Sequence, residues 1–156
     1  MGIFAQLMYQ ALLWKERQRA RFASHALPPP ASEAEHLKTG KRGENLAYWY
    51  LRQAGYVIVA RNRRARSGAG EIDLIGWDGP VLSFVEVKTR TSADFAAPER
   101  NVGTEKQRRM LRAAEDYLRR TEVPWSRARF DIVSIVLSKP PKLEWRRGAF
   151  RRPEGR

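Results

Sequence analysis

The alternation of apolar and polar positions predicts a β-sheet in the middle of this chain. Short runs rich in β-branched and aromatic residues predict strands over residues 56–60, 70–77, 81–90 and 129–137. Apolar residues at helical spacing predict helices over about 41–54 and 105–120, the second with a capping box of Thr104 and Gln107. Residues 143–145 are expected to form a short edge strand. The order of helix, three strands, helix and strand predicts one α/β domain.

The two ends of the chain lack this pattern. Residues 3–12 carry apolar side chains at helical spacing, and arginines follow them. This predicts an amphipathic helix that packs on its own domain, docks on a partner or touches a membrane. Three prolines at 28–30 predict a stiff linker. We therefore divide the chain into a helix with a Pro-rich linker (1–36), an α/β domain (37–145) and a basic disordered tail (146–156).

The charge of the chain indicates what the domain binds. Among 156 residues, 30 Lys and Arg exceed 17 Asp and Glu, which gives a formal net charge of +13. This excess favours a polyanionic partner, with nucleic acid favoured over an anionic membrane surface. No stretch approaches the ~20 apolar residues that a membrane span needs, and the glycine-rich fingerprints of nucleotide cofactors are absent. We expect a cytoplasmic protein without a transmembrane segment or small-molecule cofactor.

Missing residue types limit the chemistry of the domain. The chain has no cysteine, which excludes disulfides and cysteine-ligated metal sites. Its two histidines, His25 and His36, lie in the N-terminal part, so histidine catalysis and histidine ligation are not expected within the domain. Carboxylates and lysine must therefore perform any reaction there.

Two predicted strands carry acids and a lysine at matching positions. Asp73 lies in the run GEIDLI, and Glu86 and Lys88 lie in the run FVEVKTR after a short turn. With Asp78 and Gly79 as the central turn residues, side-chain alternation places these three groups on one face of a hairpin. Such a face can hold a divalent cation beside a phosphodiester.

The same turn predicts which residues face each other across the hairpin. Asp73 is expected opposite Phe84, and Glu71 opposite Glu86, where two like charges repel. Lys88, a shared proton or a cation would relieve this repulsion. An ordinary salt bridge from Glu86 or Asp73 to Lys88 is the alternative to a metal site.

A fourth acid joins this group. Glu44 stands at the spacing of the buried stripe of the first helix, where an unpaired carboxylate is costly. If that helix packs on the hairpin, Glu44 approaches Asp73 and Glu86. These hard oxygen ligands suit Mg²⁺ or Mn²⁺. Lys88 would then orient the attacking water or offset charge in the transition state.

Basic residues outside the hairpin are candidates for contacts with nucleic acid. Four arginines before a glycine-containing stretch predict a mobile arm on phosphates, or else a solvated loop: Arg61, Arg63, Arg64 and Arg66. Cations of the second helix would follow a phosphate backbone if they share the side of Glu86, and otherwise form a solvated face: Lys106, Arg108, Arg109 and Arg112. Arg90 is added to these candidates. Trp49 and Tyr50 are expected to pack in the protein, and Asp131 is expected to be structural.

Taken together, these motifs resemble a known family. The segments GKRGE (40–44), AGY (54–56), GEIDLI (70–75), FVEVKTR (84–90) and RFD (129–131) are similar to those of the YraN-like family of bacterial proteins. That family is similar to archaeal Holliday-junction resolvases and to the restriction-endonuclease-like superfamily. The resemblance covers about residues 40–137. It implies a restriction-endonuclease-like α/β fold, with a mixed sheet flanked by helices in the order αβββαβ.

The resemblance also implies a PD-(D/E)xK-type site. Four residues match its acids and its lysine: Glu44, Asp73, Glu86 and Lys88. The carbonyl of Val87 is implied as a further metal ligand, and Ile72 replaces the proline of the motif. Glu71 belongs to the family-like run and is kept as an accessory acid.

The sequence therefore predicts a divalent-metal-dependent DNA endonuclease that acts on branched or repair-related DNA, with Mg²⁺ or Mn²⁺ as cofactor. Because junction resolvases work as dimers across a two-fold junction, analogy favours a homodimer. The main alternative is a nucleic-acid-binding adaptor with an inactive nuclease-like site. A third interpretation makes the N-terminal helix a membrane or partner anchor.

Overall fold

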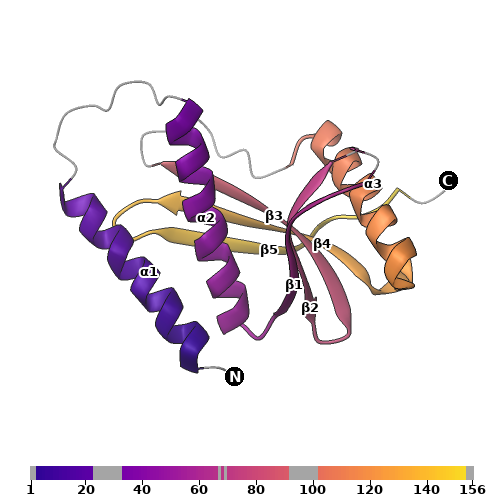
Figure 1. Ribbon diagram of the computed structural model, residues 1–156, viewed down its shortest axis with the longest axis horizontal. Helices are drawn as coiled ribbons and strands as arrows, with labels where there is room; N and C mark the ends of the chain where they lie inside the picture. Colours follow the sequence, from indigo (N-terminus) through magenta and orange to yellow (C-terminus); the bar gives the residue numbers. More distant parts are fainter. Residues whose placement is uncertain (1–2, 23–32, 67, 69, 92–101, 154–156) are drawn as a thin grey trace. The chain divides into compact units, whose positions relative to one another are not determined.

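The computed structural model describes residues 3–22, 33–66, 68, 70–91 and 102–153, without the side chains of 16–22 and 33. Its elements in chain order are α1 (Ile3–Phe22), α2 (Glu33–Gln53), β1 (Val57–Arg64), β2 (Glu71–Asp78), β3 (Val81–Thr91), α3 (Thr104–Thr121), a 3-10 turn (Trp125–Arg127), β4 (Ala128–Leu137) and β5 (Lys142–Phe150) (Figure 1). The five strands form one sheet in the order β1-β2-β3-β4-β5. This confirms the predicted mixed α/β fold with an extra N-terminal helix.

The chain forms two compact units. The first comprises Met1–Gly55, Val87–Ala97 and Ser134–Glu144, and the second comprises Tyr56–Glu86, Pro98–Val133 and Trp145–Arg156. The candidate residues are divided between them. Glu44, Val87 and Lys88 belong to the first unit, whereas Asp73 and Glu86 belong to the second.

Three elements extend further than the sequence pattern predicts. Helix α2 begins at Glu33, β1 continues to Arg64, and β5 runs to Phe150. Part of the expected linker, arginine arm and disordered tail therefore has regular structure. Residues 34–38 and 61–64 are exposed, so they carry no apolar period that would reveal a helix or strand. Backbone hydrogen bonds nevertheless hold β1 against β2 along the arginines, because the ladder does not depend on side-chain type.

The hairpin of β2 and β3 turns one residue later than predicted. Asp78 pairs with Val81, so Gly79 and Pro80 are the central turn residues. Gly79 has a positive φ of 58°, whereas the ring of Pro80 requires a negative φ. This combination suits a type II′ turn, in which only the first central residue needs positive φ. The prediction that Asp78 and Gly79 form the turn is therefore wrong.

The later turn changes the cross-strand partners. Ile75 lies opposite Phe84, where Asp73 was predicted, so the predicted register is wrong by two residues. The same shift removes the predicted pairing of Glu71 with Glu86. Repulsion between Glu71 and Glu86 as directly opposed residues is therefore not expected.

The core of the second unit forms where α3 packs on the strands. Met110 and Leu118 of α3 are buried in one cluster with Ile75 and Phe84 of the hairpin. Phe84 also stacks on Phe130 of β4, with ring centroids 5.5 Å apart. Continuous apolar packing therefore fixes the position of α3 over β2 and β3 within this unit.

The start of α3 lacks the predicted capping box. Gly103 is the N-cap, and no side chain caps the helix. Gln107 instead donates from its side-chain amide to the carbonyl oxygen of Val102 at 2.7 Å. Thr104 is already helical, so its hydroxyl is one residue too late to act as a cap.

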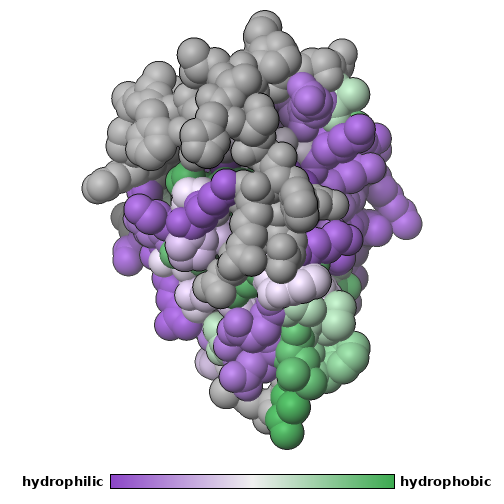
Figure 2. Space-filling view, turned by 90° about the vertical axis from the view of Figure 1, so that its left-hand side faces the viewer, coloured by the Kyte–Doolittle hydropathy of each residue, from purple (hydrophilic) through white to green (hydrophobic). Residues whose placement is uncertain are grey.

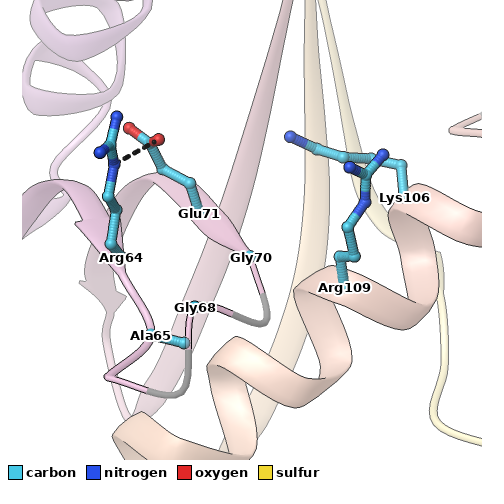
Figure 3. Close-up of a pocket in the computed structure, with 7 residues that line it drawn as sticks. All are labelled: Arg64, Ala65, Gly68, Gly70, Glu71, Lys106 and Arg109. Atoms are coloured by element: carbon cyan, nitrogen blue, oxygen red, sulfur yellow. Dashed lines mark hydrogen bonds and ion pairs between the residues drawn. The ribbon is translucent and has the colours of Figure 1, made fainter.

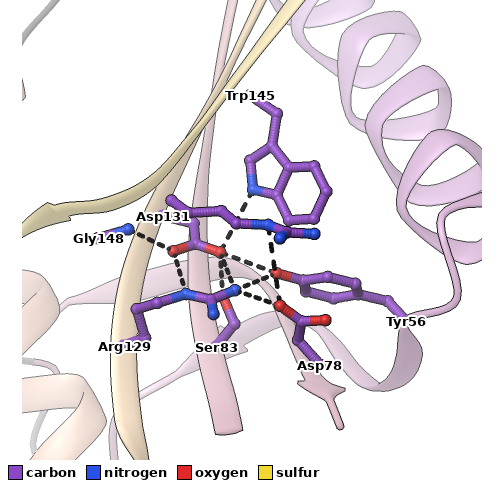
Figure 4. Close-up of polar contacts among 8 residues, drawn as sticks. Tyr56, Asp78, Ser83, Arg129, Asp131, Trp145 and Gly148 are labelled. Carbon is purple, nitrogen blue, oxygen red and sulfur yellow. Dashed lines mark hydrogen bonds and ion pairs between the residues drawn. The ribbon is translucent and has the colours of Figure 1, made fainter.

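A buried carboxylate organises the polar interior of the second unit (Figure 4). Asp131 of β4 has no exposed surface. It accepts hydrogen bonds of 2.8–3.3 Å from Tyr56, Ser83, Arg129, Trp145 and Gly148. Arg129 also donates to Asp78 at 2.8 Å, which ties the turn of the hairpin to this network. These contacts give Asp131 the structural role that the sequence predicts.

The network sets the ionisation of its members. Burial alone would raise the pKa of Asp131, but hydrogen bonds from Arg129 and Gly148 outweigh burial and hold that pKa below its usual range. Hydrogen bonding to Asp131 raises the pKa of Arg129. Burial, reinforced by the charge of Asp131, raises the pKa of Tyr56. At neutral pH, Asp131 and Arg129 are therefore charged and Tyr56 is neutral.

Helix α1 contacts α2 and leaves much apolar surface exposed. Phe4 packs edge-on against Trp49, and Tyr9 against Tyr50, at centroid distances of 5.8 and 5.6 Å. Trp49 and Tyr50 therefore pack within the protein, as predicted. Ile3, Phe4, Leu7 and Trp14 remain 62–75% exposed, and Figure 2 shows hydrophobic surface gathered at one end of this face. No helix among the described residues is long and apolar enough to cross a membrane.

Candidate functional site

A nearly buried glutamate on β3 forms an ion pair with α3. Glu86 is only 8% exposed, and Lys106 Nζ lies 3.0 Å from Glu86 Oε2, at angles outside those of a hydrogen bond. A carboxylate in such a place is costly without a compensating cation. Lys106 supplies that cation, although the sequence pointed to Lys88, a shared proton or a metal. Lys106 therefore lies on the same side as Glu86. This is the position that the cations of α3 need if they are to follow a phosphate backbone.

Glu71 has a different partner on the surface. Arg64 Nε donates to Glu71 Oε2 at 3.1 Å across the paired strands β1 and β2. The side chain of Arg64 is 82% exposed and that of Glu71 is 35% exposed, so the pair contributes little, about 0–1 kcal/mol. The accessory role of Glu71 stays a prediction.

Asp73 and Lys88 are half-buried residues of β2 and β3. Glu86 and Lys88 are two residues apart in one strand, so alternation gives them the same face. Alternation does not show which face of the sheet the Asp73 side chain occupies. Strict alternation would put Ile72 and Ile75 on opposite faces of β2, yet both belong to one core cluster. Within the described part of the chain, no three Asp, Glu or His side chains form a group that could hold a metal ion. The role of Asp73 as a ligand stays a prediction.

Glu44 lines a small hollow in the first unit. This hollow has a volume of about 260 Å³ and lies where α2 meets the end of β3. Its lining consists of His36, Thr39, Gly40, Glu44, Val87, Thr89 and Thr91. Glu44 and Val87, both predicted as metal ligands, thus line one cavity, and threonine hydroxyls add further oxygen atoms. We call this cavity the Glu44 hollow.

The Glu44 hollow depends on a close approach of α2 to β3. A Cβ atom at Gly43 would stand 1.7 Å from Thr89 Oγ1, so only glycine permits this distance. The Oγ1 atom of Thr89 is buried and has no hydrogen-bond partner among the described residues. Gly43 and Thr89 both stand in motifs that resemble the family, but neither is charged, so sequence reasoning assigned them no role.

His36, which the sequence placed before the domain, lines the Glu44 hollow. Because α2 begins at Glu33, His36 lies on the same helix as Glu44, with Gly40 between them at a spacing of four residues. Residues at this spacing share one face of a helix. Eight residues span about 12 Å along the axis, so His36 lies too far from Glu44 to share one ion by direct ligation.

The predicted arginine arm is not an irregular loop. Arg61, Arg63 and Arg64 are exposed residues of β1, so the prediction of a mobile arm is wrong for them. The backbone N–H of Arg66 donates to Asp116 of α3 at 3.2 Å, which anchors the chain after the strand. Their contacts with nucleic acid, and that of Arg90 in β3, stay predictions.

The sequence is similar to those of an extensive bacterial family. The pattern of the uncharacterised protein family UPF0102 matches residues 43–135. A UPF0102 protein of Solibacter usitatus is 57% identical over 71% of this chain and 84% of that relative. Relatives from Koribacter versatilis and Rhodococcus opacus are 47% and 44% identical, over 80% and 75% of this chain and 87% and 99% of their own lengths.

Proposed function

The chain belongs to the uncharacterised protein family UPF0102, as the YraN-like resemblance predicted, and we propose that it is a divalent-metal-dependent DNA endonuclease. One observation carries this proposal: a nearly buried acid, Glu86, directly precedes a residue that lines the oxygen-rich Glu44 hollow. The net charge of +13 supports a polyanionic substrate. Branched or repair-related DNA is the proposed substrate class.

The donor atoms fit a hard divalent cation. Glu44 and the carbonyl of Val87, which line the Glu44 hollow of the first unit, would hold it. Asp73 and Glu86 are the further ligands that the sequence predicts. The buried Thr89 hydroxyl lacks a partner among the described residues, and water bound to a cation in the Glu44 hollow would satisfy it. These groups supply only oxygen, which suits Mg²⁺ or Mn²⁺. When bound, the ion would make water more acidic and polarise the phosphate.

The chain itself contributes charge and orientation. Lys88 shares a face of β3 with Glu86, where its ammonium group offsets negative charge that develops on the phosphate. Lys106 compensates the negative charge of Glu86 in a nearly buried position. Gly43 lets α2 approach β3, and this approach brings Glu44 to the cavity that Val87 lines.

Glu86→Gln and Asp73→Asn are expected to lower Mn²⁺-dependent cleavage of a labelled four-way junction, flap or duplex by about 100-fold or more. Each substitution removes a charged ligand and keeps the shape of the side chain. Binding of the same DNA in EDTA should stay within about threefold, because phosphate contacts do not involve these acids. Single-turnover cleavage and fluorescence anisotropy measure the two effects.

Glu115→Gln is the control for this experiment. It removes an exposed acid of α3 that lines neither the Glu44 hollow nor the cavity beside Lys106. Its cleavage rate should equal that of the native protein. If the native protein binds DNA and cuts none of the three substrates with Mg²⁺ or Mn²⁺, the adaptor interpretation replaces the nuclease.

Thr89→Val is expected to separate stability from metal binding. Removing a buried hydroxyl without a described partner should leave the free energy of unfolding unchanged or raise it by up to about 1 kcal/mol. The Mn²⁺ affinity measured by calorimetry should fall several-fold, because the hollow loses an oxygen that orients bound water. Thr104→Val, at an exposed position of α3, should change neither quantity. Equal Mn²⁺ affinity in Thr89→Val and native protein would remove Thr89 from the site.

A further inference from the structure

A second hollow, in the second unit, is lined mainly by cationic groups. It has a volume of about 470 Å³ and is lined by Arg64, Ala65, Gly68, Gly70, Glu71, Lys106 and Arg109. Figure 3 shows Lys106 and Arg109 reaching from α3 on one side, with Arg64 and Glu71 on the other. Three cationic side chains and one acidic side chain line it, so the hollow is electropositive. We call it the Arg109 hollow.

The floor of the Arg109 hollow is shaped by glycine. Ala65 N–H donates to the Gly70 carbonyl oxygen at 2.9 Å. A Cβ atom at Gly70 would stand 2.8 Å from the backbone oxygen of Arg109. Gly70 therefore approaches the backbone of α3 more closely than a residue with a side chain could.

The cations of the Arg109 hollow differ in how far they are already neutralised. Arg64 pairs with Glu71, and Lys106 pairs with Glu86. Arg109 is exposed and makes no ion pair with an acid in the described part of the chain. An arginine without an acidic partner among the described residues is suited to a phosphate group, which guanidinium binds through two parallel hydrogen bonds.

We propose that the Arg109 hollow binds a phosphodiester of the DNA backbone next to the bond that is cut. This inference rests on the proposed function and deepens it, since it identifies where the substrate strand lies. Lys106 is the physical link, because it lines the hollow and also contacts Glu86. A strand with one phosphate on Arg109 therefore passes beside the carboxylate that the proposed reaction uses.

The test compares Arg109→Ala with Arg108→Ala. The two arginines are neighbours on α3, both exposed, and only Arg109 lines the hollow. Alanine keeps the Cβ of Arg109, and thermal melts check that both variants fold. The affinity for a labelled four-way junction and duplex is measured in EDTA across a salt series. Arg109→Ala should weaken binding roughly tenfold and reduce the slope of log K against log salt by about one, whereas Arg108→Ala should stay within about twofold.

Two outcomes would overturn the inference. Equal weakening in both variants would show that α3 acts only through its general positive charge. Displacement of DNA by a free mononucleotide at the same phosphate concentration, lost in Arg109→Ala, would show a nucleotide pocket instead of a backbone contact. The backbone contact is supported if only Arg109→Ala loses DNA affinity and if inorganic phosphate and a mononucleotide compete weakly with DNA.

The experiments distinguish failure of the phosphate-binding proposal from failure of the proposed nuclease activity. If the native protein cleaves DNA with Mn²⁺ while Arg109→Ala and Arg108→Ala bind DNA with equal affinity, phosphate binding by the hollow is refuted and the proposed nuclease activity is supported. If the native protein cleaves none of the DNA substrates, and only Arg109→Ala loses DNA affinity, phosphate binding by the hollow is supported and nuclease activity is refuted.

Discussion

Asp131→Ala is expected to lower the free energy of unfolding by about 3–5 kcal/mol at pH 7. The substitution leaves the guanidinium of Arg129 with less compensation in a half-buried position and removes the acceptor of Ser83 and Gly148. It also loosens the connection of β4 to the hairpin, because Arg129 joins Asp131 to Asp78. Urea unfolding followed by circular dichroism measures the loss.

Two further variants serve as a control and as a milder test of the same network. Glu115→Ala removes an exposed acid from α3 and should change stability by no more than about 0.5 kcal/mol. If Asp131→Ala does not fold, Tyr56→Phe removes one donor to the same carboxylate and should cost about 1–2 kcal/mol. A Tyr56→Phe protein as stable as the native one would contradict the importance of the network.

The same carboxylate predicts how stability depends on pH. The pKa of Asp131 is lowered in the folded state, relative to about 3.9 in the unfolded chain. A lowered folded pKa means that the unfolded state binds the proton more readily, so this stabilisation is complete above about pH 4 and is lost as the pH falls through the folded pKa. The stability gap between native protein and Asp131→Asn should therefore narrow below pH 4.

Gly43→Ala is expected to destabilise the protein by about 1–3 kcal/mol and to weaken Mn²⁺ binding. The added Cβ would stand 1.7 Å from Thr89 Oγ1 and 2.7 Å from Thr89 Cβ, so α2 must move away from β3. That movement would separate Glu44 from Val87, which together line the Glu44 hollow. Chemical unfolding and calorimetric Mn²⁺ titration measure the two effects.

Gly40→Ala is the matched control on the same helix. A Cβ at Gly40 meets nothing within 4 Å, so the better helix propensity of alanine should stabilise the protein by about 0.5–1 kcal/mol. The two glycine substitutions therefore have opposite expected signs. Thr89→Gly should partly rescue Gly43→Ala, since it removes the atoms that collide. Destabilisation of equal size in both glycine variants would contradict the close-approach argument.

The sequence predicted the fold well where burial repeats regularly. The strands around Ile75, Phe84 and Ile132 are buried runs, and α3 buries Met110 and Leu118 at helical spacing. Exposed segments were missed, because the early part of α2, the arginine part of β1 and the end of β5 bury few side chains and are held by backbone hydrogen bonds. The turn was misplaced by one residue, since Asp-Gly and Gly-Pro are both acceptable turn pairs and only the strand ladder selects between them.

Of the residues at the Glu44 hollow, the sequence indicated Glu44 and Val87 and assigned no role to Thr89 or to Gly43 beside it. Glu86 and Lys88 could be found because acids and lysines in a strand pattern are conspicuous. Thr89 and Gly43 could not be found, because their importance lies in a distance between α2 and β3. The partner of Glu86 could not be predicted from the local pattern either, because Lys106 follows Glu86 in the sequence only after residues 92–101.

The sequence by itself determined the fold class, the family, the excess of positive charge and the strand that carries Glu86 and Lys88. These properties depend on composition and on patterns within a few residues, which a chain encodes locally. Only the tertiary structure decided that Lys106 compensates Glu86, that Glu44 and Thr89 line one cavity, and that Arg109 faces an electropositive hollow. Each of these results requires two segments distant in the chain to meet, and their meeting is set by the packing of helices on the sheet.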